Sequence, residues 1–221
     1  MMKQMKKKLA ILSCLILALA TGSVTATKYP PRDLDAPSRT ILGITLGQSD
    51  LAMVQAKLGP AKLWGGGDGG DAESKVCYAT RDPNSLVIIY AANSEMSPDH
   101  VVTNIRILQR DAYKDRSNCL PLPIGGNEVG TPSNLKIGLS REKVRALLGP
   151  PARIGRSEWS YDWSVDRTIP KTDKYYQRWL DKHEECFEGK EPYYTTSSGI
   201  TVQFKNDLAV ALTFFRIDSI C

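Results

Sequence analysis

The sequence predicts an α+β fold of two tandem repeats, each a short helix or helical hairpin packed on a small antiparallel β-sheet. A helical insertion is expected in the second repeat. Three observations predict this fold. Residues 46–61 recur as residues 137–152 with Gly, Ser, apolar and Gly-Pro residues in the same order and a one-residue difference in length. Strand-like segments follow each copy, and Pro- and Gly-rich residues 120–131 separate the halves. The expected modules are residues 40–119 and 132–221.

The N-terminus has the features of a secretory signal peptide. Residues 1–8 carry four lysines and no acid, residues 9–20 are apolar, and small side chains precede Ala26. This apolar core is shorter than the roughly 20 residues that span a bilayer. We expect residues 1–26 to be cleaved after Ala26, with Ala20 as the alternative, leaving no integral membrane segment.

Residues 27–39 are then an N-terminal extension of a nearly neutral chain. The whole sequence has 29 basic and 24 acidic residues, a formal net charge of +5, but four of the lysines belong to the signal peptide. Without them, 25 basic residues stand against 24 acidic ones. Nucleic-acid binding depends on a basic surface that neutralises phosphates, so no nucleic-acid partner is expected.

Each of the two similar segments predicts a short helix. Both have a Ser that can cap the first turn, an acid within that turn, and a Gly-Pro end. The apolar stripes are Leu51, Val54 and Leu58 in the first helix, and Val144, Leu147 and Leu148 in the second. Helices this short are not stable alone, so both stripes must dock on a larger element.

Three strand-like segments follow each predicted helix. They are rich in β-branched and aromatic residues and are bounded by Gly, Asn, Asp and Pro. They lie at residues 75–79, 85–90 and 100–108 in the first half, and at 157–163, 199–204 and 208–215 in the second. The order of helix, strand, strand and strand is therefore the same in both halves.

An insertion, residues 167–198, separates the first two strands of the second half. From near Asp173, apolar and aromatic residues recur at helical spacing. The insertion is therefore expected to contain an amphipathic helix.

The two Gly-x-Ser to Leu-Gly-Pro segments, residues 47–60 and 138–150, carry a resemblance to known families. They resemble the helix-on-sheet module of the SmpA/OmlA (BamE-type) outer-membrane assembly lipoproteins. They are also similar to the secreted β-lactamase inhibitor protein, which has two such modules in tandem. The resemblance implies this fold and a tendency to bind other proteins, in an exported bacterial protein.

Cysteine usage fits an oxidising compartment. Once Cys14 leaves with the signal peptide, four cysteines remain: Cys77, Cys119, Cys186 and Cys221. An even number favours disulfides in an exported protein. Of the three possible pairings we favour Cys77 with Cys119 and Cys186 with Cys221, because each pair then falls within one half. We expect the protein to be periplasmic or secreted.

No cofactor or metal is expected. Residues 65–71 form a Gly- and Asp-rich segment, and calcium binding through Asp68, Asp71 and Glu73 is the alternative to a plain connecting loop. Calcium-binding repeats of this composition act as stacked copies, and only one copy is present here. The loop is therefore interpreted as a connection.

Catalysis is disfavoured, although an envelope hydrolase stays open as an alternative. Only His100 and His183 can act as an imidazole base, and the sequence has no Gly-x-Ser-x-Gly nucleophile motif. A glycosidase carboxylate pair has no fixed spacing in sequence. Sequence patterns therefore identify no catalytic residue.

Aromatic residues concentrate in the second half. Of the 17 Phe, Trp and Tyr residues, twelve follow Pro150. Trp159, Tyr161 and Trp163 alternate along one predicted strand and share one of its faces. That face is either packed in the core or, with the insertion, a binding surface. The candidate binding residues are Trp159, Tyr161, Trp163, Tyr176, Trp179 and Tyr194.

These observations together favour an exported, non-enzymatic binding protein. Tyr and Trp are the residue types that most often anchor protein interfaces. We therefore expect the partner to be another protein of the cell envelope or outside the cell, bound by an aromatic-rich surface of the second module. A cell-wall glycan would stack on the same side chains and is the alternative ligand.

Overall fold

The computed structural model describes residue 35 and residues 37–66, 72–81, 85–93, 100–113, 118–172, 181 and 193–219. The first half holds strands β1 (Thr40–Ile41), β2 (Ile44–Thr45), β3 (Trp64–Gly66), β4 (Glu73–Ala79), β5 (Leu86–Asn93) and β6 (Asn104–Gln109). The second holds β7 (Leu120–Pro121), β8 (Arg153–Ile154), β9 (Glu158–Thr168), β10 (Tyr193–Lys205) and β11 (Leu208–Ser219). The α-helices are α1 (Leu51–Leu58) and α2 (Arg141–Leu148), and short 3-10 helices span Pro37–Arg39, Arg110–Ala112 and Gly126–Glu128.

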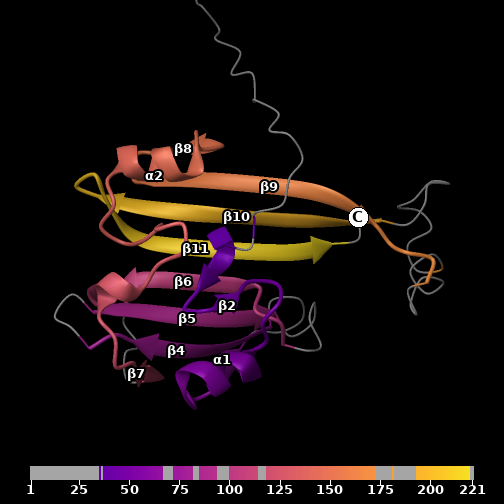
Figure 1. Ribbon diagram of the computed structural model, residues 1–221, viewed down its shortest axis with the longest axis horizontal. Helices are drawn as coiled ribbons and strands as arrows, with labels where there is room; N and C mark the ends of the chain where they lie inside the picture. The colour runs from indigo at the N-terminus through magenta and orange to yellow at the C-terminus, as the bar shows by residue number, and fades with distance from the viewer. Residues whose placement is uncertain are drawn as a thin grey trace, which may run out of the picture.

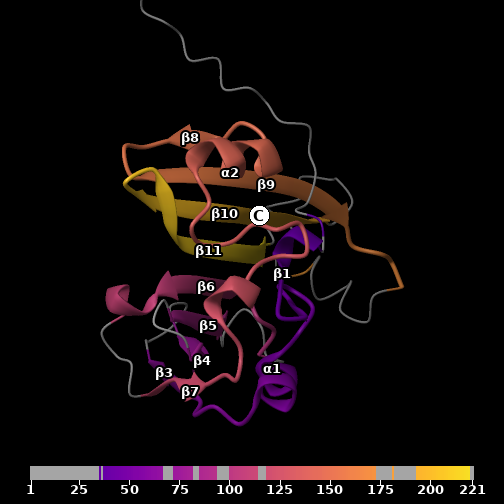
Figure 2. The ribbon, with the colours of Figure 1, turned by 60° about the vertical axis from the view of Figure 1, so that its left-hand side comes forward.

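One sheet runs through both halves of the chain. Its strand order is β3-β4-β5-β6-β11-β10-β9-β8, and β7 lies beside β4. β7 pairs parallel with β4, while the strands along that order pair antiparallel. β1 and β2 form a separate two-stranded hairpin. Figures 1 and 2 show this sheet with α1, α2 and the hairpin on the same side of it.

The predicted α+β class with two helix-on-sheet repeats is wrong. The chain is a β-rich fold, mostly antiparallel sheet, with two α-helices in the part that the structure describes. β6 pairs with β11 from Asn104 to Leu108, so the two halves share one sheet. Separate small sheets would each leave an edge strand with unpaired backbone groups, and the β6–β11 pairing satisfies both edges at once.

The two short helices are confirmed where the sequence predicts them. The Asp50 carboxylate accepts a hydrogen bond from the Met53 N–H at 2.7 Å, and the Ser140 hydroxyl accepts one from the Lys143 N–H at 3.4 Å. Gly59 and Gly149 follow the last turns with φ of 103° and 84°, a region that favours glycine. α2 therefore starts at the predicted serine, whereas in α1 the cap is Asp50 instead of Ser49, and both helices end at the predicted glycine.

Both helices are attached to the sheet through the glycine that precedes them. The Gly47 N–H donates to the Val102 carbonyl at 2.8 Å, just before β6, and the Gly138 N–H donates to the Ala209 carbonyl at 2.8 Å, in β11. These two glycines have φ of 76° and 86°. The entry segment of α1 is thus hydrogen-bonded to the residues that lead into β6, and that of α2 to β11.

A continuous core lies between the sheet and the helix layer. Leu51 and Val54 of α1, Val144 of α2, and residues of the connection such as Leu135 pack with the inward side chains of β4 to β6 and β9 to β11. Because these residues belong to one cluster, the two halves are joined by packing as well as by hydrogen bonds.

Two buried tyrosines anchor the helix layer to the sheet. The Tyr78 hydroxyl donates to the Gly59 carbonyl at 2.8 Å, and the Tyr90 hydroxyl donates to the Ile41 carbonyl at 3.1 Å. Their rings meet edge to face with centroids 6.1 Å apart. β4 and β5 therefore hold the end of α1 and the β1–β2 hairpin directly.

No helix among the described residues has both the length and the apolar character needed to cross a membrane.

Candidate functional site

The sheet has a second face, opposite α1 and α2, which we call the outer face. Since side chains alternate along a strand, the neighbours of the core residues Tyr90, Ile105 and Phe214 point to this side. Cross-strand pairing places one row of outer-face residues across the middle of the sheet: Lys75, Ala91, Asn104, Phe215, Gly199 and Asp162. This row crosses from the first half of the chain to the second.

The Phe215 ring approaches Gly199 closely near the centre of the outer face. A Cβ at Gly199 would lie 2.6 Å from Cζ of the Phe215 ring and 2.7 Å from the Tyr161 carbonyl oxygen. Only glycine leaves room for this close approach, and an aromatic ring over a strand glycine shields its backbone. Phe215 is half-buried, so part of its ring faces solvent.

Two cationic side chains meet Glu73 on β4, three strands away from Phe215 on β11. The Lys75 ammonium lies 3.3 Å and the Arg106 guanidinium 3.6 Å from the Glu73 carboxylate. The Arg106 Nε also donates to the Asn104 side-chain oxygen at 3.2 Å. Lys75 lies over the Trp64 ring, 4.3 Å from its centroid. Two cations thus share one carboxylate, and the Arg106 side chain stays 44% exposed.

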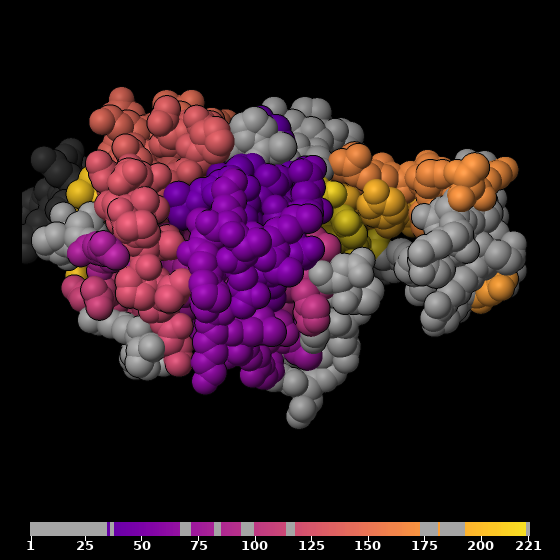
Figure 3. All heavy atoms as spheres, turned by 60° about the horizontal axis from the view of Figure 1, so that its bottom comes forward, coloured from indigo at the N-terminus to yellow at the C-terminus, as the bar shows by residue number. Residues whose placement is uncertain are grey.

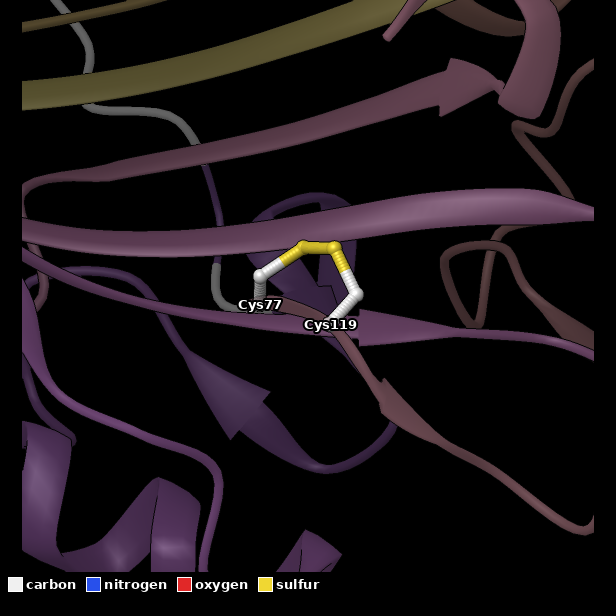
Figure 4. The surroundings of a disulfide bond; sticks show 2 residues. All are labelled: Cys77 and Cys119. Carbon is white, nitrogen blue, oxygen red and sulfur yellow. A yellow bond between two sulfur atoms is a disulfide. The ribbon is translucent and has the colours of Figure 1, made fainter. Parts of the chain in front are cut away.

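The predicted Cys77–Cys119 disulfide is confirmed, and it lies on the outer side of the first half. Its Cα atoms are 4.5 Å apart, and it ties β4 to the segment that leads into β7 (Figure 4). Cys77 packs with Val87 and Ile89, and Trp64 and Tyr113 border this small cluster. The disulfide fits an oxidising compartment. Cys186 and Cys221, the other predicted pair, lie outside the described residues.

Trp159, Tyr161 and Trp163, the predicted binding triplet, lie in the core. Their exposed fractions are 8%, 2% and 8%. Trp159 packs edge to face on Phe204 with centroids 5.1 Å apart, and Tyr161 stacks on Trp163 at 6.3 Å. The outer face of the same strand carries Ser160, Asp162 and Ser164 instead. The triplet therefore forms no exposed surface.

The structure does not bring the remaining candidates together with this triplet. Tyr194 is half-buried on β10, where it pairs with Arg167 of β9. Tyr176 and Trp179 lie outside the described residues, as does most of the predicted insertion helix.

The residues considered for metal binding and catalysis do not form a common site among the described residues. Glu73 is held by Lys75 and Arg106, while Asp68 and Asp71 lie outside the described residues. Within the described ranges, no group of three or more His, Cys, Asp or Glu residues could hold a metal ion. His100 is exposed with φ of 52°, and its carbonyl accepts the Leu51 N–H at 3.2 Å. His183 is outside the described residues.

Burial shifts the pKa of both anchoring tyrosines. Desolvation raises the pKa of Tyr78 to about 12, outweighing a backbone hydrogen bond at Ala61 that lowers it. Desolvation also raises the pKa of Tyr90, and the nearby Tyr78 adds to that shift. Both hydroxyls are engaged by backbone carbonyls on the core side. These pKa shifts therefore result from the packing of the helix layer on the sheet.

The sequence interpretation missed Phe215 and Arg106, the two side chains that stand out on the outer face. One local signal was available for the first, because Gly199 interrupts a β-branched strand and a strand glycine often marks the close approach of another group. No local pattern marks Arg106. Its hydrogen-bond partner Asn104 is two residues earlier in β6, but its ion-pair partner Glu73 comes from β4, far away in the sequence.

Comparisons with protein-family models, with curated proteins and with solved structures give no match for this chain. The functional interpretation is therefore based on the geometry of the outer face.

Proposed function

We propose that this chain is an exported, non-enzymatic protein that binds another protein through the outer face of its sheet. The single observation behind this proposal is the Phe215 ring laid over Gly199 at the middle of a sheet face that no described helix covers. In the second half of the chain such a face offers a pre-formed surface with an aromatic ring on β11, whereas Cys77, Val87 and Ile89 on the outer side of the first half are buried. This proposal replaces the Trp159–Trp163 surface by the opposite face of the same sheet.

The residue types on this face favour a protein as the partner. Aromatic residues and Arg are enriched among the side chains that dominate binding energy. Phe215 and the partly exposed Arg106 come from neighbouring strands, two pairs apart along the β6–β11 register. Ile217, 41% exposed, continues the apolar strip along β11. An apolar centre with a charged group at its border is the usual composition of a protein interface.

Arg106 is partly pre-organised for such a contact. Its hydrogen bond to Asn104 and its ion pair with Glu73 restrict the guanidinium before any partner arrives. A restricted side chain loses less conformational entropy on binding. Because Lys75 already neutralises part of the Glu73 charge, an acidic group of the partner would meet a net positive site.

Export is supported by two features. The Cys77–Cys119 disulfide needs an oxidising environment to persist, and residues 1–20 have the charge and apolar pattern of a signal peptide. We therefore place the protein in the periplasm or outside the cell, where its partner would be an envelope or extracellular protein.

A glycan is the second candidate ligand, and the same ring favours it. A flat aromatic ring suits stacking against a sugar, and Asp162, paired across from Gly199, could accept hydrogen bonds from its hydroxyls. The Asp162 carboxylate is, however, bound by Arg153 at 3.2 Å. Binding of sugars would have to compete with this ion pair, so the protein partner is preferred.

Affinity capture from the native envelope tests the proposal. With Phe215→Ala or Arg106→Ala, we expect recovery of a stoichiometric partner protein to fall at least about tenfold, as for truncation of an interface hot spot. Met53→Ala is the matched control, because Met53 is 54% exposed on α1, on the other side of the sheet. Circular dichroism verifies that each variant is folded.

Two results would count against a protein-binding outer face. Unchanged capture by both folded variants would remove this face as the interface. Binding of soluble cell-wall fragments to the wild type but not to Phe215→Ala, without any recovered protein, would favour the glycan instead.

A further inference from the structure

β9 lies near the border of the sheet, and within the described residues only β8 pairs with its outward edge, at one end. β8 pairs with Trp159 and Ser160, whereas residues 162–168 pair with β10 on the inner side and with no other described strand. Figure 1 shows β8 beside one end of β9, and in Figure 3 the orange and yellow ends of β9 and β10 extend beyond the indigo first half. An exposed strand edge is a template for pairing with another strand.

The hydrogen bonds to the β8 side define which groups point outward. The carbonyls of Glu158 and Ser160 accept from the N–H groups of Gly155 at 2.7 Å and Ala152 at 2.8 Å. Since the backbone direction alternates with every residue, the N–H and C=O groups of Asp162, Ser164, Asp166 and Thr168 point to the same side. Ser164, Asp166 and Thr168 are exposed residues.

We propose that a second copy of this chain pairs with this edge, β9 against β9 and antiparallel, about a two-fold axis at Val165. Ser164 then faces Asp166 of the partner subunit, and Asp162 faces Thr168 of the partner subunit. The outward groups of each copy meet in hydrogen-bonded pairs, and the two sheets become one continuous sheet. This interface is separate from the proposed binding face, so neither proposal depends on the other.

Charge selects this register over its neighbours. Outward residues of one strand must face outward residues of the other, so the neighbouring symmetric registers are those with the two-fold axis at Ser164 or at Asp166. A shift in one direction places Asp166 opposite Asp166 of the partner subunit, and a shift in the other places Asp162 opposite Asp166 of the partner subunit. Like charges directly opposite each other destabilise a strand pair. The register centred on Val165 is the one that faces each aspartate with a hydroxyl residue.

The ends of the edge also fit this register. Pro170 follows β9 and has no backbone N–H to donate. In the proposed dimer, Pro170 of the partner subunit comes opposite Ser160, where β8 already occupies the edge. The pairing therefore uses the length of β9 beyond its pairs with β8 and stops where β8 begins, without displacing it.

The expected dimer is weak and concentration-dependent. One strand edge buries less than the roughly 800 Å² per partner that is typical of stable interfaces. We expect a dissociation constant in the micromolar range, and sedimentation velocity between about 1 and 200 μM should show a monomer–dimer shift. A monomer throughout that range would overturn the proposal, and it is also the result expected if this edge receives a strand of a different protein.

Cysteine crosslinking tests the register. In the proposed dimer Val165 is a non-hydrogen-bonded pair on the two-fold axis, with Cα atoms about 4.5 Å apart, within the range of a disulfide. We expect Val165→Cys to give an oxidised dimer linked through residue 165, identified by peptide mapping. Asp166→Cys is the control, because its two copies lie diagonally, about 7–8 Å apart. A crosslink at 166 and not at 165 would refute the proposed register.

Proline substitution provides an independent measurement. Ser164→Pro removes an outward N–H from the centre of the interface but no bond to β10, so the fold should tolerate it at an edge. We expect at least a tenfold weaker dimer, whereas Ser164→Ala keeps the N–H and should dimerise like the wild type. Equal dimerisation of a folded Ser164→Pro and Ser164→Ala would contradict pairing through this edge.

Discussion

Trp163 illustrates how single residues hold the second half of the core. Its ring stacks on Tyr161 with an interplanar angle of 15°, and both rings are covered on the helix side of the sheet. Large aromatic side chains bury more apolar area than any other residue type. Their loss is therefore expected to affect folding before it affects any contact with a partner.

Trp163→Ala should lower the free energy of unfolding by about 3–5 kcal/mol, the usual cost of truncating a buried aromatic residue. Ser164→Ala, on the other face of the same strand and exposed, should change it by less than about 0.5 kcal/mol. Urea unfolding followed by tryptophan fluorescence and circular dichroism measures both. Equal stability of the two variants would show that the Trp163 ring is not part of the core.

At the scale of elements, sequence patterns located helices and strands better than they located their ends. Both repeat helices and all six predicted strands are present, while most of the predicted insertion helix lies outside the described residues. β9, β10 and β11 continue well beyond the predicted runs. The extra residues, such as Val165 to Thr168, are polar or charged, so no hydrophobic pattern marks them. They are strand because they pair with β10, which is a contact between distant segments.

Tyr78 and Tyr90, which join the sheet to its covering elements, should make the folding stability depend on pH. Burial raises the pKa of Tyr78 from 10.0 to about 12, and it also raises the pKa of Tyr90. The unfolded chain therefore loses these protons first, and stability should fall as the pH rises above about 10. Below that pH both states keep the protons, and the two groups cause no change.

Urea unfolding at pH 8 to 11 checks this expectation. The Tyr78→Phe/Tyr90→Phe variant should be less stable at pH 8, because it lacks the hydroxyl bonds to Gly59 and Ile41, but its stability should decline less steeply above pH 10. An alkaline decline as steep as that of the wild type would assign the effect to other groups.

At the scale of the whole molecule, the β6–β11 pairing makes the two halves one cooperative unit. The core cluster contains residues of both halves, and β6 and β11 pair over Asn104–Leu108 and Ala211–Phe215. Unfolding either half would expose a strand edge and core side chains of the other. Two independent modules, in contrast, would lose structure one after the other.

We therefore expect a single unfolding transition for the oxidised chain, with the same midpoint by tryptophan fluorescence and by circular dichroism. Val54→Ala in the first half and Trp163→Ala in the second should both shift that one transition to lower denaturant concentration. Two separate transitions, each moved by only one of the variants, would show that the halves fold independently.

The sequence by itself determined the local features of this protein. Side-chain caps and glycines at Gly59 and Gly149 define α1 and α2, alternating and apolar runs define the strands, and even cysteine usage led to the Cys77–Cys119 pair. Each of these depends on interactions within a few residues or on simple counting. The sequence therefore predicted the two repeat helices and the six main strands, but not the five short strands β1, β2, β3, β7 and β8 or the fold class.

Only the tertiary structure decided how the elements combine and which faces remain accessible. The alternation of Trp159, Tyr161 and Trp163 shows that three rings share a face, but not whether that face is covered. That depends on α2 and the connection before it packing on the same side. The join of β6 to β11, the placement of Phe215 over Gly199 and the position of β9 near the border of the sheet likewise come from pairings between distant segments, which no local pattern encodes.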